Sequence, residues 1–92
     1  MFPFEVPENT AALTCRHVLN EGRPIQYAYH DDDGDWQFLC GGSHAEEDAV
    51  VVTLKQVFDR DPSIAPLATL PEGMSAERET PDGRWKAYSP TR

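Results

Sequence analysis

The chain has few cysteines, no long apolar run and few cations, and each shortage excludes a class of protein. Its 92 residues include two cysteines, Cys15 and Cys40, which is too few for a disulfide framework. No stretch approaches the roughly 20 apolar residues that span a bilayer. The first residues, Met1–Glu5, have neither the basic region nor the apolar run of a signal peptide. We therefore expect a cytoplasmic protein whose thiols stay reduced.

Cations are the scarcest charged residues. Eight Lys and Arg stand against sixteen Asp and Glu, for a net charge of −8. This balance argues against nucleic acid or an anionic membrane as a partner, because both require a basic footprint. Between Pro24 and Leu54 there are seven carboxylates and no Lys or Arg. Such a surface suits a basic protein as partner.

The length allows one hydrophobic core. We predict a flexible N-terminal arm over residues 1–9 and a single α+β domain over 10–92. The eight prolines favour short elements. The expected architecture is an antiparallel sheet of four or five short strands, arranged as two hairpins, with one or two short helices on one face.

The clearest predicted element is a hairpin from Ile25 to Cys40. Alternation at period two puts one set of residues on one face of each strand: Ile25, Tyr27 and Tyr29 in the first, Trp36, Phe38 and Cys40 in the second. A two-residue Asp33-Gly34 turn is a strong hairpin signal. It would, however, set Asp32 opposite Asp35, and two like charges facing each other destabilise a hairpin. A four-residue loop instead sets His30 opposite Asp35 and Tyr29 opposite Trp36. We prefer the four-residue loop, with the shared aromatic face as core.

The remaining elements are predicted from caps and turns. Residues 13–20 fit either a helix over Cys15–Asn20, capped by Thr14 and ended by Gly22, or a strand through Leu13–His17. The other signals are two capping boxes (Ser43-x-x-Glu46 and Thr53-x-x-Gln56), a buried strand over Ala49–Thr53, a cap and turn at Asp61-Pro62, and a second hairpin from Met74–Glu79 and Arg84–Tyr88.

One stretch resembles a known family. Asp33-Gly34-Asp35-Trp36-Gln37-Phe38-Leu39-Cys40-Gly41, preceded by the Tyr27–Tyr29 strand, resembles the immunity-protein-33-like family of small bacterial domains. Asp61-Pro62-Ser63 and Leu70-Pro71-x-Gly73 are similar to uncharacterised bacterial relatives, and the likeness covers about the middle two-thirds of the chain. The pair Gly34-Asp35 departs from the family pattern before Trp36, where a Ser-Gly or similar pair is usual. The resemblance implies toxin neutralisation or a related binding role without catalysis.

Metal and catalytic chemistry are possible at the cysteines. Cys15-x-His17 and Cys40-x-x-x-His44 supply four ligands of the kind zinc prefers, although Cys40 also fits a small buried apolar residue. The aspartates at 31–35 do not follow the order of an EF-hand. A Cys40 nucleophile with His30 or His44 as base lacks an accompanying oxyanion hole or phosphate loop. We therefore predict no enzymatic activity and no cofactor.

The leading hypothesis is a non-enzymatic bacterial protein-binding domain of toxin-immunity type that presents acidic loops to a basic surface. Its predicted contact residues are His30, Asp31, Asp32, Asp33, Asp35, Glu46, Glu47 and Asp48. A solvated acidic rim that only maintains solubility is the simpler explanation of the same residues. The alternative function is a small zinc protein that uses Cys15, His17, Cys40 and His44.

Overall fold

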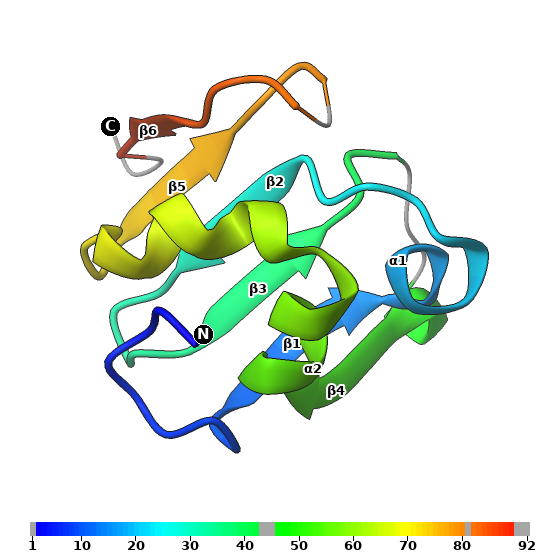
Figure 1. Ribbon diagram of the computed structural model, residues 1–92, viewed down its shortest axis with the longest axis horizontal. Coiled ribbons are helices and arrows are strands. Elements are labelled where there is room, and N and C mark those ends of the chain that lie inside the picture. Colours follow the sequence, from blue (N-terminus) through cyan, green and yellow to red (C-terminus); the bar gives the residue numbers. More distant parts are fainter. Residues whose placement is uncertain (1, 43–45, 81, 90–92) are drawn as a thin grey trace.

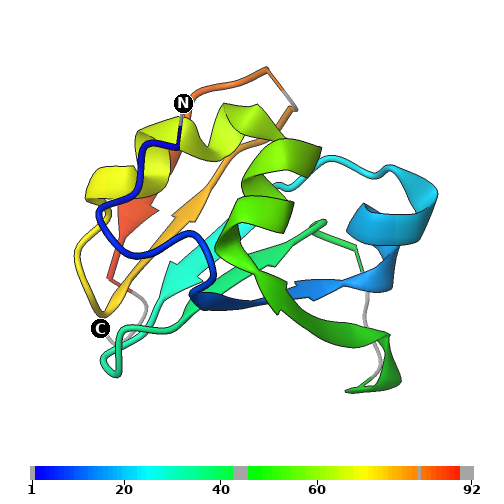
Figure 2. The same cartoon turned by 60° about the horizontal axis from the view of Figure 1, so that its bottom comes forward.

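The computed structural model describes residues 2–42, 46–80 and 82–89, in which one six-stranded sheet carries helices on one of its faces (Figures 1 and 2). The elements, in chain order, are β1 (Ala11–Cys15), α1 (Arg16–Glu21), β2 (Tyr27–His30), β3 (Trp36–Leu39), the 3-10 helix η1 (Glu46–Asp48), β4 (Ala49–Thr53), α2 (Leu54–Arg60), the 3-10 helix η2 (Pro62–Thr69), β5 (Met74–Glu77) and β6 (Lys86–Tyr88).

The sheet is mixed, with strand order β4-β1-β3-β2-β5-β6. β1 and β3 run parallel, and every other neighbouring pair is antiparallel. The predicted α+β class is confirmed. The predicted antiparallel sheet of four or five strands is confirmed in part: four of the five strand pairings are antiparallel, but the sheet has six strands and is mixed, because β1 inserts between β3 and β4 and runs parallel to β3.

Both alternatives for residues 13–20 are realised in part, because a strand is followed directly by a helix. β1 ends at Cys15, α1 begins at Arg16, and Gly22 closes the helix with φ of 71°, a left-handed conformation that glycine adopts without strain. Thr14 does not cap this helix. Its Oγ1 is buried in the sheet and donates to the carbonyl of Phe38 at 2.6 Å.

The local signals around α2 and η2 are confirmed. Thr53 and Gln56 form a reciprocal capping box at the start of α2. The Asp61 carboxylate accepts from the Ser63 amide at 3.1 Å, with Pro62 as the first residue of η2. The second hairpin is present as β5 and β6. The Ser43 capping box lies outside the described residues.

β4 forms where predicted, but it is not a buried strand. It pairs with β1 alone and forms one edge of the sheet. Val51 at its centre is 68% exposed. The apolar, β-branched run Ala49–Thr53 therefore reflects strand propensity and an open apolar face more than burial.

The core lies between the sheet and the layer of α2 and η2 (Figure 2). Trp36 and Phe38 of β3 face this layer, and both are buried. Phe4, from the segment predicted as a flexible arm, packs edge-on against Trp36, with ring centroids 5.1 Å apart, and is 6% exposed. Phe2 makes a similar edge contact with Phe58 of α2. The N-terminal segment thus adds aromatic surface to the core.

The first hairpin has a register that differs by one residue from the prediction. His30 pairs with Trp36 and Tyr27 pairs with Leu39, so the loop holds the five residues from Asp31 to Asp35. The predicted pairing of His30 with Asp35 is wrong. Because side chains alternate across a strand, a shift of one residue moves a whole row to the opposite face. Tyr27 and Tyr29 therefore lie on the face opposite to Trp36, and only the β3 part of the predicted aromatic core is confirmed.

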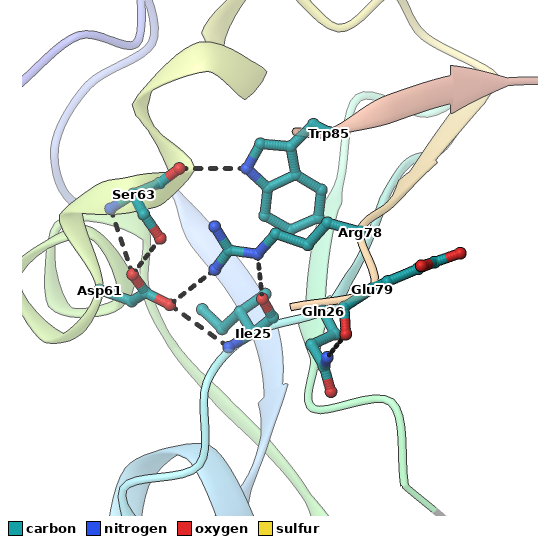
Figure 3. Close-up of polar contacts among 7 residues, drawn as sticks. All are labelled: Ile25, Gln26, Asp61, Ser63, Arg78, Glu79 and Trp85. Carbon is teal, nitrogen blue, oxygen red and sulfur yellow. Dashed lines mark hydrogen bonds and ion pairs between the residues drawn. The ribbon is translucent and has the colours of Figure 1, made fainter. Parts of the chain in front are cut away.

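A buried polar network ties the C-terminal hairpin to the start of η2 (Figure 3). The Arg78 side chain is 2% exposed and donates to the carbonyl of Ile25 at 2.9 Å and to Asp61 at 3.2 Å. Its guanidinium lies 4.3 Å from the ring centroid of Trp85. The Trp85 indole donates in turn to the Ser63 carbonyl at 3.1 Å. This network fixes β5 and β6 against the helical layer.

Candidate functional site

Within the described residues, no helix covers the second face of the sheet (Figure 2). We call this surface the open face. The strand registers assign alternate residues to it, and its large side chains are Leu13, Tyr27, Tyr29, Leu39, Val51 and Tyr88. Val51 is its most exposed member, and Tyr88 is 37% exposed. Six apolar and aromatic side chains on one uncovered face are a feature of interaction surfaces.

Two tyrosines of the open face, Tyr27 and Tyr88, are held in place by hydrogen bonds to residues of β5. The Tyr27 hydroxyl lies 3.1 Å from Ser75 Oγ. Tyr88 donates to Glu77 at 2.6 Å, and this bond, followed by partial burial, raises the pKa of Tyr88 to about 12. Fixed aromatic rings that keep a polar tip provide contact area at little entropic cost. Tyr27 and Tyr88 are thus arranged before any partner arrives.

The hairpin loop places carboxylates next to the open face. Asp32, Asp33 and Asp35 are exposed. Desolvation, followed by the charges of Asp32 and Asp31, raises the pKa of Tyr29. The negative charges of the loop therefore act electrostatically on a tyrosine of the open face. The apolar patch and the acidic loop form one continuous candidate surface.

Asp31 has a structural role within the loop. Its Oδ1 accepts from the backbone amides of Asp33 at 2.9 Å and of Asp35 at 3.0 Å. An aspartate that satisfies amides two and four residues ahead stabilises a turn. Asp31 therefore shapes the loop, while Asp32, Asp33 and Asp35 present the exposed charge.

The structure adds one carboxylate that sequence analysis missed. Glu72, in the turn before β5, lies beside the loop, because a methyl group placed on Gly34 would be 3.4 Å from its Oε2. The adjacent Gly73 donates its amide to the His30 carbonyl. The pairing of β2 with β5 brings this turn to the loop, and no local pattern in the sequence indicates that pairing.

His30 belongs to the helix-covered side of the sheet. Its ring stacks on Trp36, with centroids 3.8 Å apart and planes 10° apart. Its Nδ1 lies 2.7 Å from the carbonyl of Leu70. These contacts fix His30 under the connection to β5, so it does not join Asp32 and Asp33 on the outer surface of the loop.

The acidic residues near η1 lie far from the hairpin loop. The loop precedes Trp36, which pairs with Ala12, whereas η1 precedes Ala49, which pairs with Cys15 at the other end of β1. Glu47 is exposed. Asp48 forms an ion pair with Arg16 at 3.2 Å. For Glu46 the backbone alone is described. The predicted contact residues therefore divide between two ends of the sheet.

Sequence analysis missed Tyr27 and Tyr29 as surface residues because it assigned their row to the core, and it missed Val51 because it predicted Ala49–Thr53 to be a buried strand. The tyrosine hydroxyls, however, favour a surface position for this row. A buried tyrosine requires a partner for its hydroxyl, and Tyr27 and Tyr29 in one row require two. An open face supplies water or polar side chains more readily than a core does.

Three of the four residues in the zinc hypothesis come together at the η1 end of the sheet. One ligand atom from each of Cys15, His17 and Cys40 lies within 4.8 Å of the other two. Both thiols are buried, and burial raises the pKa of Cys15. His44 lies outside the described residues.

No protein-family model matches the chain, and no curated protein or solved structure matches it. None of the helices in the described part of the chain has the length and apolar character needed to cross a bilayer.

Proposed function

We propose that this protein works by binding another protein, using the open face together with the acidic hairpin loop. The observation that supports the proposal most directly is that a six-stranded sheet has helices on one face and, on the other, a row of half-buried tyrosine and leucine between exposed Val51 and Tyr88. Tyrosine is a residue that interfaces favour, because it buries a large area and still offers a hydroxyl.

The charge around the open face defines the partner. The exposed carboxylates of the hairpin loop border it, and Lys86 is the one cation within the six described strands. A partner with apolar side chains flanked by Lys or Arg would match both parts of the surface. Complementary charge of this kind mainly accelerates association and selects among partners.

The resemblance to the immunity-protein-33-like family gives the proposal a biological setting. In that setting the protein is a non-enzymatic bacterial binding domain in the cytoplasm, and the partner is a toxin with a basic surface. The carboxylates of the loop would then approach the cationic part of the toxin.

A capture experiment with the tagged protein in a lysate of its host tests the proposal. Val51→Asp introduces a charge at a position exposed enough to tolerate it, and Tyr29→Ala removes a central ring of the open face. A third variant changes Asp32, Asp33 and Asp35 to Asn but keeps Asp31, which holds the loop. The matched control is Asp59→Asn on α2, where the exposed carboxylate pairs with Lys55.

We expect the wild-type protein and the Asp59→Asn control to capture the same partner. Tyr29→Ala should reduce affinity by about 30-fold if the ring is a hot spot worth about 2 kcal/mol. The triple Asn variant should bind more slowly and lose most of its dependence on salt. Equal capture by all variants would refute the assignment of the surface, and the absence of any specific partner would refute the function.

A further inference from the structure

The parallel pairing of β1 with β3 brings two distant cysteines to one end of the sheet. Thr14 is in register with Phe38. Each strand then runs in the same direction to a cysteine, Cys15 as the last residue of β1 and Cys40 directly after β3. Both side chains are buried. Twenty-four residues of sequence thus separate two thiols that the fold places side by side.

His17 completes this group from the first turn of α1. Because the helix begins at Arg16, directly after β1, the ring of His17 folds back over the strand ends. Its Nδ1 lies 3.8 Å from Cys40 Sγ. The potential ligand atoms of Cys15, His17 and Cys40 all lie within 4.8 Å of one another. We call this group the Cys-His-Cys cluster.

The separations in the cluster are close to those of a tetrahedral zinc site. With Zn–S near 2.3 Å and Zn–N near 2.0 Å, tetrahedral geometry sets neighbouring ligand atoms about 3.5–3.8 Å apart. The contact between Cys40 and His17 has this length already. The other ligand atoms are at most 4.8 Å apart, so they need to approach by no more than about 1 Å. Small changes of side-chain torsion angle within the same rotamers supply that movement.

A carboxylate lies on the other side of the histidine ring. Asp48 Oδ2 is 4.0 Å from His17 Nε2, and Arg16 holds the other oxygen of Asp48 at 3.2 Å. Metal-binding histidines commonly direct the second ring nitrogen to a carboxylate, which fixes the tautomer and the ring orientation. The cluster thus has an outer residue placed to leave Nδ1 free of its proton and directed at the thiols.

We propose that Cys15, His17 and Cys40 bind a zinc ion, with Asp48 orienting His17 from outside. Each thiol loses its proton on binding, and the two thiolates balance the charge of the divalent ion. The imidazole binds in its neutral form through Nδ1. These three residues leave one position of the tetrahedron for a water molecule or another ligand. The site lies at the opposite end of β1 from the hairpin loop, so it is separate from the acidic part of the proposed protein-binding surface.

Cobalt(II) is the probe that tests the proposal, because it replaces zinc in such sites and absorbs light. We expect the reduced protein to give a near-ultraviolet thiolate-to-cobalt charge-transfer band and the visible bands of tetrahedral geometry, saturating at a single equivalent. Added zinc should abolish them. Cys15→Ser and Cys40→Ser should each weaken the charge-transfer band, and the double variant should lose it.

Two further variants test the roles of the other residues. Asp48→Asn should keep the spectrum and lower the affinity about 10–100-fold, as changes to outer residues of zinc sites do. Asp59→Asn is the matched control for lost negative charge and should bind as the wild type does. His17→Gln should weaken binding, whereas His30→Gln, at the far end of the sheet, should not.

The wild-type protein provides a measurement that does not depend on the folding of variants. In nitrogen-detected NMR spectra, zinc should shift the ring resonances of His17 and leave those of His30 unchanged. A reduced protein that shows no charge-transfer band overturns the proposal. So does a band of equal strength in both cysteine variants, or a His17 ring that does not respond to zinc.

Discussion

Replacing Arg78 with leucine should destabilise the protein strongly, because the guanidinium is the central donor of a buried network. The side chain is 2% exposed and makes two hydrogen bonds, one to the Ile25 carbonyl and one to Asp61, beneath the ring of Trp85. Leucine fills much of the volume but removes both donors. The Ile25 carbonyl then loses a buried partner, and Asp61 loses its countercharge.

The size of the stability loss in Arg78→Leu depends on the contacts that Asp61 keeps. Breaking a buried ion pair by removing one partner costs roughly 3–5 kcal/mol. The lower end applies, because Asp61 keeps the amides of Ile25 and Ser63 as donors and its side chain is 19% exposed. A loss of about 3 kcal/mol lowers Tm by roughly 12–24 °C in a domain of this size.

Urea denaturation and a thermal melt measure the effect, and a double-mutant cycle isolates the pair. Asp61→Asn in the Arg78→Leu background removes the uncompensated charge, so the double variant should be more stable than the sum of the single effects by about 0.5–3 kcal/mol. Lys55→Ala, which breaks an exposed pair with Asp59, is the control and should leave the melt unchanged. An Arg78→Leu protein as stable as wild type, or a strictly additive cycle, would refute this account.

Three further predictions concern single contacts and the metal. Thr14→Val removes the buried hydrogen bond to the Phe38 carbonyl and should cost about 1 kcal/mol in urea denaturation. Folding raises the pKa of Tyr88 from 10.0 to about 12, so neutral Tyr88 stabilises the folded state fully below pH 10, and this stabilisation is lost as the pH rises through 12. Ultraviolet titration should show a late phenolate step that is absent from Tyr88→Phe. An equal step in that variant would contradict the assignment. Zinc at about 100 times Kd should stabilise wild type by about 2.7 kcal/mol, but not Cys40→Ser.

Local signals predicted local structure well. The capping box at Thr53 and Gln56, the cap and turn at Asp61-Pro62, and the glycine end of α1 at Gly22 are all present. Each depends on side chain to backbone contacts within a few residues, so the necessary information is adjacent in the chain. The boundaries that these caps mark were therefore predictable, even where burial, as in β4, was not.

The hairpin register was not predictable by the same means. The sequence favours a four-residue loop because a two-residue turn sets Asp32 opposite Asp35, a like-charge pair that destabilises. The structure instead accommodates a fifth loop residue, because the Asp31 carboxylate satisfies the amides of Asp33 and Asp35. His30 then stacks on Trp36 under the Leu70 carbonyl. The Leu70 carbonyl follows η2 and lies 40 residues after His30 in the sequence, beyond the reach of any local pattern.

The cysteine pair shows how much topology adds to spacing. Sequence analysis recognised Cys15-x-His17 and Cys40-x-x-x-His44 as potential ligand pairs, but an all-antiparallel sheet gave no reason for them to meet. When neighbouring strands each end in a cysteine, antiparallel strands place the two thiols at opposite ends of the strands. Parallel strands place them at the same end. Because β1 inserts beside β3 in parallel, Cys15 and Cys40 meet where α1 begins, and His17 is already at that position. The strand direction that the sequence could not reveal is thus the feature that converts two separate pairs into one candidate metal site.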